Sequence, residues 1–175
     1  MKKIEMRRHS IRVKPSPHLT QQGVEKARKV GDSLGSFNYV ISSNVPRAIE
    51  TAVAMGYAVD KVMEEVSMTP SEIDDEISWG MDFAQYNQVI TEGGKTAQYA
   101  DQMAMFIKEI SKIISDNETL LIISHGGLIE LTAIGCFPLE EYKKWGEALD
   151  TCEGVRIYLD NEEFKRIELL RVKMS

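Results

Sequence analysis

Two of the three histidines in this 175-residue sequence follow short apolar segments that are typical of buried β-strands. His9 comes after residues 3–8, and His125 comes after residues 120–124. In an open α/β sheet, ligands bind just beyond the carboxyl ends of parallel strands. If the two strands are parallel neighbours, His9 and His125 meet at one site with Arg8 beside them. Two imidazoles and a guanidinium favour an anion, and phosphate suits them best.

His9 is the candidate nucleophile of such a site. A neutral imidazole can attack phosphorus and form a phosphohistidine, which divides a difficult hydrolysis into two easier steps. Arg8 would then hold the phosphoryl oxygens with a bidentate guanidinium. The alternative is structural: His9 ends a strand with its ring bonded to a backbone carbonyl, and Arg8 lies on the surface.

The turn after the second strand has its own anion-binding chemistry. Gly126 and Gly127 allow a sharp turn or a close approach of the backbone to a ligand. The amides of the helix expected after them favour an anion, so Gly126 is a candidate phosphate contact. His125 could donate a hydrogen bond to a phosphoryl oxygen and stabilise the charge of the transition state.

Two further arginines are candidates for binding phosphate. Arg47 lies in the first turns of a helix that follows the expected strand at residues 39–43, which places it at the same sheet edge as His9. Arg12 could reach the site from the loop that contains Pro15 and Pro17. The alternative for both is the usual position of an arginine, a solvated surface.

A leaving alkoxide needs a proton, and Glu76 is the candidate general acid. Near phosphate and partly buried, its carboxyl group is expected to have a raised pKa. The residues alone leave this choice open, because the surrounding segment is rich in acids. The other candidates are Glu72, Asp74, Asp75 and Asp82.

The segments that must position these residues alternate between strand and helix patterns. Strands are expected at residues 2–9, 39–43 and 119–124, and helices at 20–34, 46–56, 96–115 and 128–134, with Thr20 and Asn44 as caps. This order predicts a three-layer α/β/α sandwich with a mostly parallel central sheet. Residues 153–159 and 164–172 predict a C-terminal antiparallel hairpin. Residues 62–94 break the alternation and are expected to form a short strand and an excursion over the active face.

The composition is that of a soluble globular protein, with 43% hydrophobic and 27% charged residues. No linker is visible, so we expect one domain over residues 1–175. A net charge of −6 argues against a nucleic-acid partner. No apolar run approaches the ~20 residues of a membrane span, and no signal peptide is apparent. Cys136 and Cys152 form neither a disulfide framework nor a metal-ligand spacing, which favours free thiols and a cytoplasmic location.

Four motifs occur in order along the chain, each on a suitable element. They are Arg8-His9-Ser10, Leu19-Thr20-Gln21-Gln22-Gly23 with Ala27, Ser43-Asn44-Val45-Pro46-Arg47-Ala48 with Thr51-Ala52, and Ser124-His125-Gly126-Gly127. Together they resemble the histidine phosphatase superfamily, which is also called phosphoglycerate mutase-like. The resemblance covers most of the chain.

This resemblance implies roles for individual residues. His9 would be the phosphorylated nucleophile, Arg8, Arg47 and His125 would complete the phosphate pocket, and no metal or other cofactor would be needed. Family members often carry a Glu-x-x-aromatic-Gly pattern, which residues 76–80 fit, so Glu76 is preferred over Glu72 and Asp82 as the acid. Ser10 stands where the family usually has glycine. Its hydroxyl would add a donor at the phosphate site, provided that its backbone φ is negative.

The function expected on these grounds is a metal-independent phosphatase. It would hydrolyse a phosphomonoester, or a phosphohistidine, through a phosphohistidine intermediate on His9. The chain is compact compared with the glycolytic mutases of the family, which favours hydrolysis by water. Three alternatives stay open: a mutase-type phosphotransferase, a phosphohistidine protein phosphatase, and an inactive module that binds a phosphorylated ligand. The partner would be a small phosphorylated metabolite or a phosphorylated protein, and the sequence determines neither the substrate nor the oligomeric state.

Overall fold

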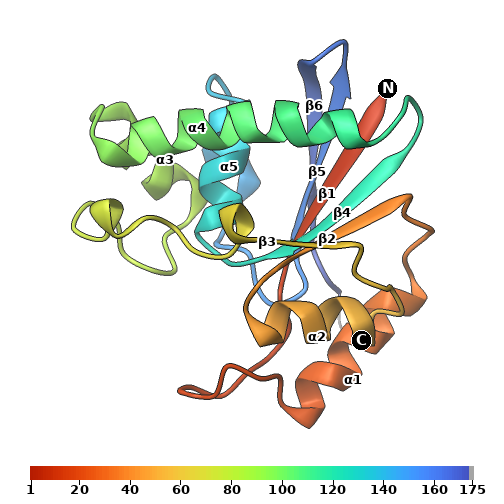
Figure 1. Ribbon diagram of the computed structural model, residues 1–175. Coiled ribbons are helices and arrows are strands. Elements are labelled where there is room, and N and C mark those ends of the chain that lie inside the picture. Colours follow the sequence, from red (N-terminus) through yellow and green to blue (C-terminus); the bar gives the residue numbers. More distant parts are fainter. Residues whose placement is uncertain (174–175) are drawn as a thin grey trace.

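The computed structural model describes residues 1–173, and its centre is a six-stranded sheet (Figure 1). The strand order is β3-β2-β4-β1-β5-β6. The first four are mutually parallel, whereas β5 pairs antiparallel with both β1 and β6, which confirms the mostly parallel sheet and its terminal hairpin. The strands are β1 (Lys2–Arg8), β2 (Tyr39–Ser43), β3 (Lys61–Met63), β4 (Thr119–Ser124), β5 (Gly154–Asp160) and β6 (Glu163–Leu170).

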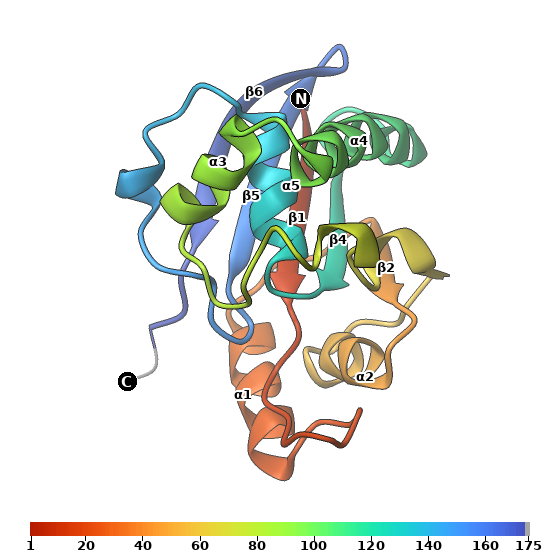
Figure 2. The same ribbon diagram turned by 90° about the vertical axis from the view of Figure 1, so that its left-hand side faces the viewer.

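Helices cover both faces of this sheet, as the two perpendicular views show (Figures 1 and 2). One face carries α1 and α2, and the other carries α3, α4 and α5. The α-helices are α1 (Gln21–Asp32), α2 (Pro46–Ala54), α3 (Phe83–Thr91), α4 (Lys95–Ile110) and α5 (Leu128–Cys136). The three-layer α/β/α prediction is therefore correct. None of these helices in the described chain combines the length and hydropathy needed to cross a lipid bilayer.

Strand β4 shows why the apolar segment at residues 119–124 is a central strand. Successive side chains of a strand point to opposite faces of the sheet. Leu120 and Ile122 accordingly belong to the apolar core under α3, α4 and α5, while Leu121 and Ile123 belong to the core under α1 and α2. All four side chains are fully buried, so a continuous apolar run is what both faces require.

The pairing of β1 with β4 determines where the two histidines lie. The strands are parallel neighbours, and their register places Arg8 opposite Ser124. The backbone N–H of His9 continues this ladder by donating to the carbonyl of Ser124 at 2.9 Å. His9 and His125 therefore follow equivalent positions on adjacent strands, as expected from the sequence.

The largest departure from the expected elements is α3, inside the segment expected to be an irregular excursion. Asp82 and Gln85 form a reciprocal capping box: the Gln85 N–H donates to Asp82 Oδ1 at 2.8 Å, and the Asp82 N–H donates to Gln85 Oε1 at 2.9 Å. The Asp-x-x-Gln spacing was the available signal for this helix. The expected cap by Asn44 is also wrong, because α2 begins after Val45 without a side-chain cap, whereas Thr20 caps α1 as predicted.

Candidate active site

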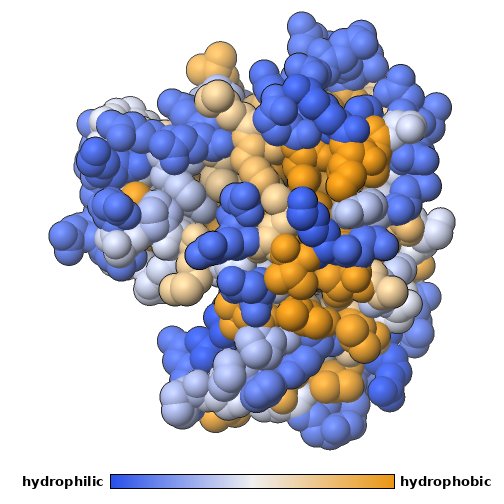
Figure 3. Space-filling view, in the orientation of Figure 1, coloured by the Kyte–Doolittle hydropathy of each residue, from blue (hydrophilic) through white to orange (hydrophobic). Residues whose placement is uncertain are grey.

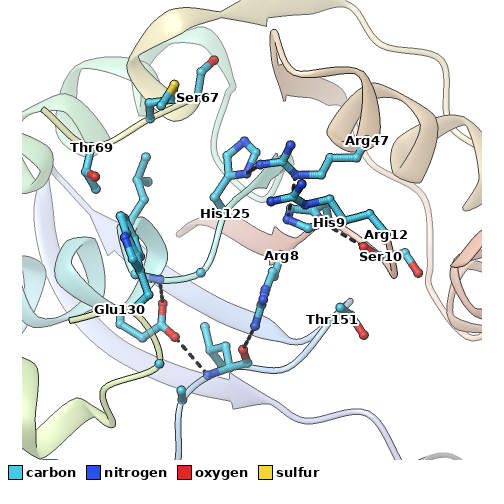
Figure 4. A pocket seen from close by; sticks show the side chains of 18 of the residues that line it. Arg8, His9, Ser10, Arg12, Arg47, Ser67, Thr69, His125, Glu130 and Thr151 are labelled. Atoms are coloured by element: carbon cyan, nitrogen blue, oxygen red, sulfur yellow. Dashed lines mark hydrogen bonds between the residues drawn. The ribbon is translucent and has the colours of Figure 1, made fainter. Parts of the chain in front are cut away.

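A cavity of about 630 Å³ lies beyond the carboxyl ends of β1 and β4. Its lining includes Arg8, His9, Arg47 and His125, which come from the ends of β1 and β4 and from the start of α2. In Figure 4 the side chains of His9, Arg47 and His125 converge, while that of Arg8 extends away from them along the cavity wall. Figure 3 shows the surface notch on this side of the molecule, between the part formed by α3 and α4 and the part formed by α1 and α2. The sheet edge thus brings together four of the residues singled out from the sequence.

The hydrogen bonds of His9 define its tautomer. Its Nδ1 lies 2.7 Å from the carbonyl oxygen of Ser10, so Nδ1 must carry the proton and donate it. Its Nε2 accepts from Nε of Arg47 at 3.0 Å. The lone pair on Nε2 is therefore unprotonated and faces a cation, which is the state that a nucleophilic imidazole requires.

His125 faces the same guanidinium from the other side. Its Nδ1 lies 3.3 Å from Nη2 of Arg47, which can only donate. Its Nε2 lies 2.7 Å from Oγ of Ser43, so in the neutral ring Nε2 carries the proton and donates to that hydroxyl. The centroids of the His9 and His125 rings are 5.2 Å apart. Arg47 therefore bridges the two imidazoles.

Burial and positive charge keep both rings neutral. Desolvation is the main cause, and it lowers the pKa of His9 to about 4 and that of His125 to about 3. The nearby guanidinium groups of Arg47 and Arg8 are smaller contributors to these two lowered pKa values. At neutral pH the positive charge of the site therefore comes from its arginines, while the imidazole of His9 keeps its nucleophilic lone pair.

These pKa values predict an acid-sensitive fold. Between pH 6.5 and about 4 the unfolded chain binds protons on His9 and His125 that the folded chain does not, so stability is full above pH 6.5 and falls on acidification. Each ring should contribute about 1.4 kcal/mol per pH unit. We expect the Tm to fall less over this range in the His9→Gln/His125→Gln variant than in a variant of the exposed His18. Parallel pH curves for the two variants would contradict the pKa shifts.

Arg8 is held by a chain of bonds that the sequence did not suggest. Its Nη1 donates to the carbonyl of Leu149 at 2.6 Å, and the N–H of Leu149 donates to Oε1 of Glu130 at 2.9 Å. The other oxygen of Glu130 accepts from the N–H of Gly127 at 2.7 Å. Glu130 is 1% exposed, so it ties the turn after His125 to the loop that carries Leu149. Nε of Arg8 is buried without a protein partner, which leaves a donor for a ligand.

Ser10 and Gly126 both line the cavity, but in different ways. The hydroxyl of Ser10 donates to the carbonyl of Gly23 at 2.7 Å, and its N–H donates to Oγ1 of Thr51 at 2.9 Å. The expected extra phosphate donor is therefore already engaged, and Ser10 holds the loop after β1 in place. Its backbone is not among the positive-φ residues, so it carries no strain of that kind. A Cβ on Gly126 would lie 3.2 Å from Nε of Arg8, so glycine leaves room beside that guanidinium.

Both carboxylate oxygens of Glu76, the expected general acid, are bonded to the start of α4. Its Oε1 accepts from the N–H of Lys95 at 2.9 Å, and its Oε2 accepts from the N–H and the hydroxyl of Thr96 at 2.8 and 2.6 Å. These bonds cap the N-terminus of α4. They lower the pKa of Glu76, led by the bond from the Thr96 hydroxyl, so the expected rise in its pKa is wrong. Glu76 is also not among the residues that line the cavity.

The cavity contains other residues that sequence reasoning passed over or left open. Asp74 lines it, whereas Glu72, Asp75 and Asp82 do not. Trp79 lies against the turn after His125, since a Cβ on Gly127 would be 2.6 Å from its Cζ3. The sequence held one weak indication of the role of Glu130: it lies three residues after Gly127, which is the spacing of a glutamate that caps a helix N-terminus.

The fold and the site define an α/β protein with two neutral imidazoles and two guanidinium groups around a cavity that suits an anion. The chain belongs to the histidine phosphatase superfamily (branch 1), which matches residues 5–171. The resemblance inferred from the motifs is therefore correct. No curated protein sequence matches the chain significantly.

Solved structures share this fold over nearly the whole chain. Phosphoserine phosphatase from Entamoeba histolytica, in complex with 3-phosphoglyceric acid, has a TM-score of 0.73 at 18% identity, covering 99% of this chain and 98% of that one. Mycobacterial glucosyl-3-phosphoglycerate phosphatase has a TM-score of 0.67 at 17% identity, with 99% and 100% covered. Phosphoglycerate mutase from Bacillus anthracis has a TM-score of 0.68 at 15% identity, with 96% and 92% covered. At such identities the likeness concerns the fold alone.

Proposed function

We propose that this protein is a metal-independent phosphatase that hydrolyses a phosphomonoester, or a phosphohistidine, through a phosphohistidine on His9. The observation that carries the proposal is the unprotonated Nε2 of His9, which faces Arg47 and His125 in a cavity at the sheet edge. Phosphatases among the structural neighbours support the same class of reaction. The substrate we expect is a small phosphorylated metabolite.

In the first step the phosphoryl group enters the space between the two rings. Arg47 turns its N–H groups from the imidazoles to the phosphoryl oxygens, and Arg8 offers its unpartnered Nε. Nε2 of His9 attacks phosphorus, the bond to the leaving oxygen breaks, and the leaving group takes a proton. When the phosphoryl group displaces Arg47 from Nδ1 of His125, its negative charge favours a proton on that nitrogen. Nδ1 then donates a hydrogen bond to a phosphoryl oxygen, while Nε2 keeps its bond to Ser43.

In the second step a water molecule attacks the phosphohistidine. The N–P bond breaks, inorganic phosphate forms, and His9 recovers its lone pair while Nδ1 keeps its proton for the carbonyl of Ser10. The guanidinium groups of Arg8 and Arg47 supply the positive charge that a metal ion supplies in other phosphatases. A chelator should therefore leave the rate unchanged.

The test of this function is hydrolysis of p-nitrophenyl phosphate by the purified protein with EDTA present. We expect release of p-nitrophenolate that vanadate inhibits competitively, because vanadate is a tetrahedral oxyanion that competes for the same cations. A panel of phosphorylated metabolites then identifies the leaving group. Absence of turnover on the whole panel, together with binding of vanadate, would instead favour an inactive module for phosphorylated ligands.

Proton donation to the leaving group falls to Asp74 in this proposal, because Asp74 lines the cavity and Glu76 caps α4. Asp74→Asn should lower kcat for an alkyl phosphate about 10²-fold and have less effect on p-nitrophenyl phosphate, whose leaving group needs no proton. Glu76→Gln is the matched control: it should lower the Tm through loss of the cap without this dependence on the leaving group. If Glu76→Gln is instead the variant whose effect depends on the leaving group, Glu76 and not Asp74 is the proton donor.

A further inference from the structure

One wall of the cavity carries two cations, Arg12 and Lys14, that have no role in the mechanism proposed above. Arg12 and Lys14 follow β1 and line the cavity together with the phosphate-site residues. Arg12 is half-buried, and the backbone at this position forms an isolated bridge with Leu19, which fixes the start of the loop. In Figure 4 the guanidinium of Arg12 lies next to that of Arg47.

The donors of these two side chains are largely unused. Within residues 1–173 neither Arg12 nor Lys14 has a carboxylate within ion-pair distance. Arg12 makes one long hydrogen bond, from Nη1 to the carbonyl of Ser16 at 3.3 Å, although a guanidinium has five N–H groups. In a chain of net charge −6, unpaired cations beside two further arginines indicate an anionic ligand.

In the proposed function the phosphoryl group occupies the space between the rings of His9 and His125, whose centroids are 5.2 Å apart, and Arg8 and Arg47 clamp it. That assignment leaves Arg12 and Lys14 for another part of the ligand. A cavity of about 630 Å³ has room for a leaving group as well. The rest of the ligand would extend from Arg47 toward the wall formed by Arg12 and Lys14.

We propose that Arg12 and Lys14 bind a second anionic group of the substrate, either a carboxylate or a second phosphate. The preferred substrate would then be a small phosphomonoester with two anionic groups. This inference rests on the proposed phosphatase function, and it assigns the specificity of that function to the loop after β1. Charge complementarity at this wall would act mainly on substrate binding and therefore on KM.

Two matched pairs of substrates test the inference. O-phosphoserine differs from O-phosphoethanolamine by its carboxylate, and fructose 1,6-bisphosphate differs from fructose 6-phosphate by its second phosphate. In one of the two pairs we expect kcat/KM to be at least tenfold higher for the substrate that carries the second anionic group. The pair that shows this preference identifies the second anion as a carboxylate or a phosphate. Lys14→Gln and Arg12→Gln should reduce this ratio to below threefold through KM. Arg28→Gln, an exposed arginine on α1, should keep it.

The outcomes separate this inference from the phosphatase proposal. If p-nitrophenyl phosphate is hydrolysed but both ratios stay near one, or if neither variant changes them, the second-anion site is wrong and the phosphatase stands. If no phosphomonoester is hydrolysed, the phosphatase proposal fails. In that case the same compounds are compared as ligands by calorimetry. A dissociation constant at least tenfold lower for the doubly anionic member of one pair supports the second-anion site, and a smaller difference in both pairs contradicts it.

Discussion

His9→Ala should abolish phosphatase activity, with a loss in kcat of at least about 10³-fold. The reason is that Nε2 of His9 is an unprotonated nitrogen facing Arg47 in the cavity, and alanine has no group that can form the covalent intermediate. Radioactive phosphate from the substrate should label the wild-type protein in an acid-labile, alkali-stable form, as a phosphohistidine requires. The variant should show no such label.

His18→Ala is the matched control for this experiment. His18 lies at the surface, where its side chain is 61% exposed and pairs with Glu50. We expect its kcat and its labelling to equal those of the wild type. Full activity of His9→Ala, or equal labelling of the two variants, would end the assignment of His9 as the nucleophile.

Arg47→Lys should lower kcat/KM by about 10²-fold or more although it keeps the positive charge. Arg47 reaches His9 with Nε and His125 with Nη2, and a single ammonium cannot reproduce this forked geometry. Vanadate should also bind at least tenfold more weakly to the variant, as measured by inhibition or calorimetry. Because lysine keeps the positive charge, both measurements test the forked geometry of the Arg47 guanidinium and not its charge.

Arg28→Lys provides the control, since Arg28 is exposed on α1 and outside the cavity. Both variants should unfold at temperatures close to that of the wild type, because the carbonyl of Arg47 still accepts the Oγ1 bond of Thr51. A kcat/KM for Arg47→Lys within twofold of the wild type would show that charge alone binds the phosphoryl group.

The strands and the placement of the two histidines were predictable because they depend on local patterns and on one rule of topology. The apolar run at residues 120–123 identifies β4, and the short segment around Ile4 and Met6 identifies β1. A parallel pair must present its carboxyl ends at one sheet edge. Arg47 follows for the same reason, since α2 starts directly after β2. The α3 helix was missed because the acidic residues around it obscured its Asp-x-x-Gln capping signal.

The sequence by itself determined the α/β/α class and the convergence of His9, His125, Arg8 and Arg47, because these follow from strand ends and chain polarity. Tertiary structure alone decided which carboxyl groups reach the cavity. Glu76 bonds to the helix N-terminus at Lys95 and Thr96, and Glu130 is buried between two backbone N–H groups. A carboxylate accepts hydrogen bonds from the unpaired backbone N–H groups that lie near it in the folded chain. These groups can be distant in sequence, so no periodic pattern of residues predicts which carboxylate meets them.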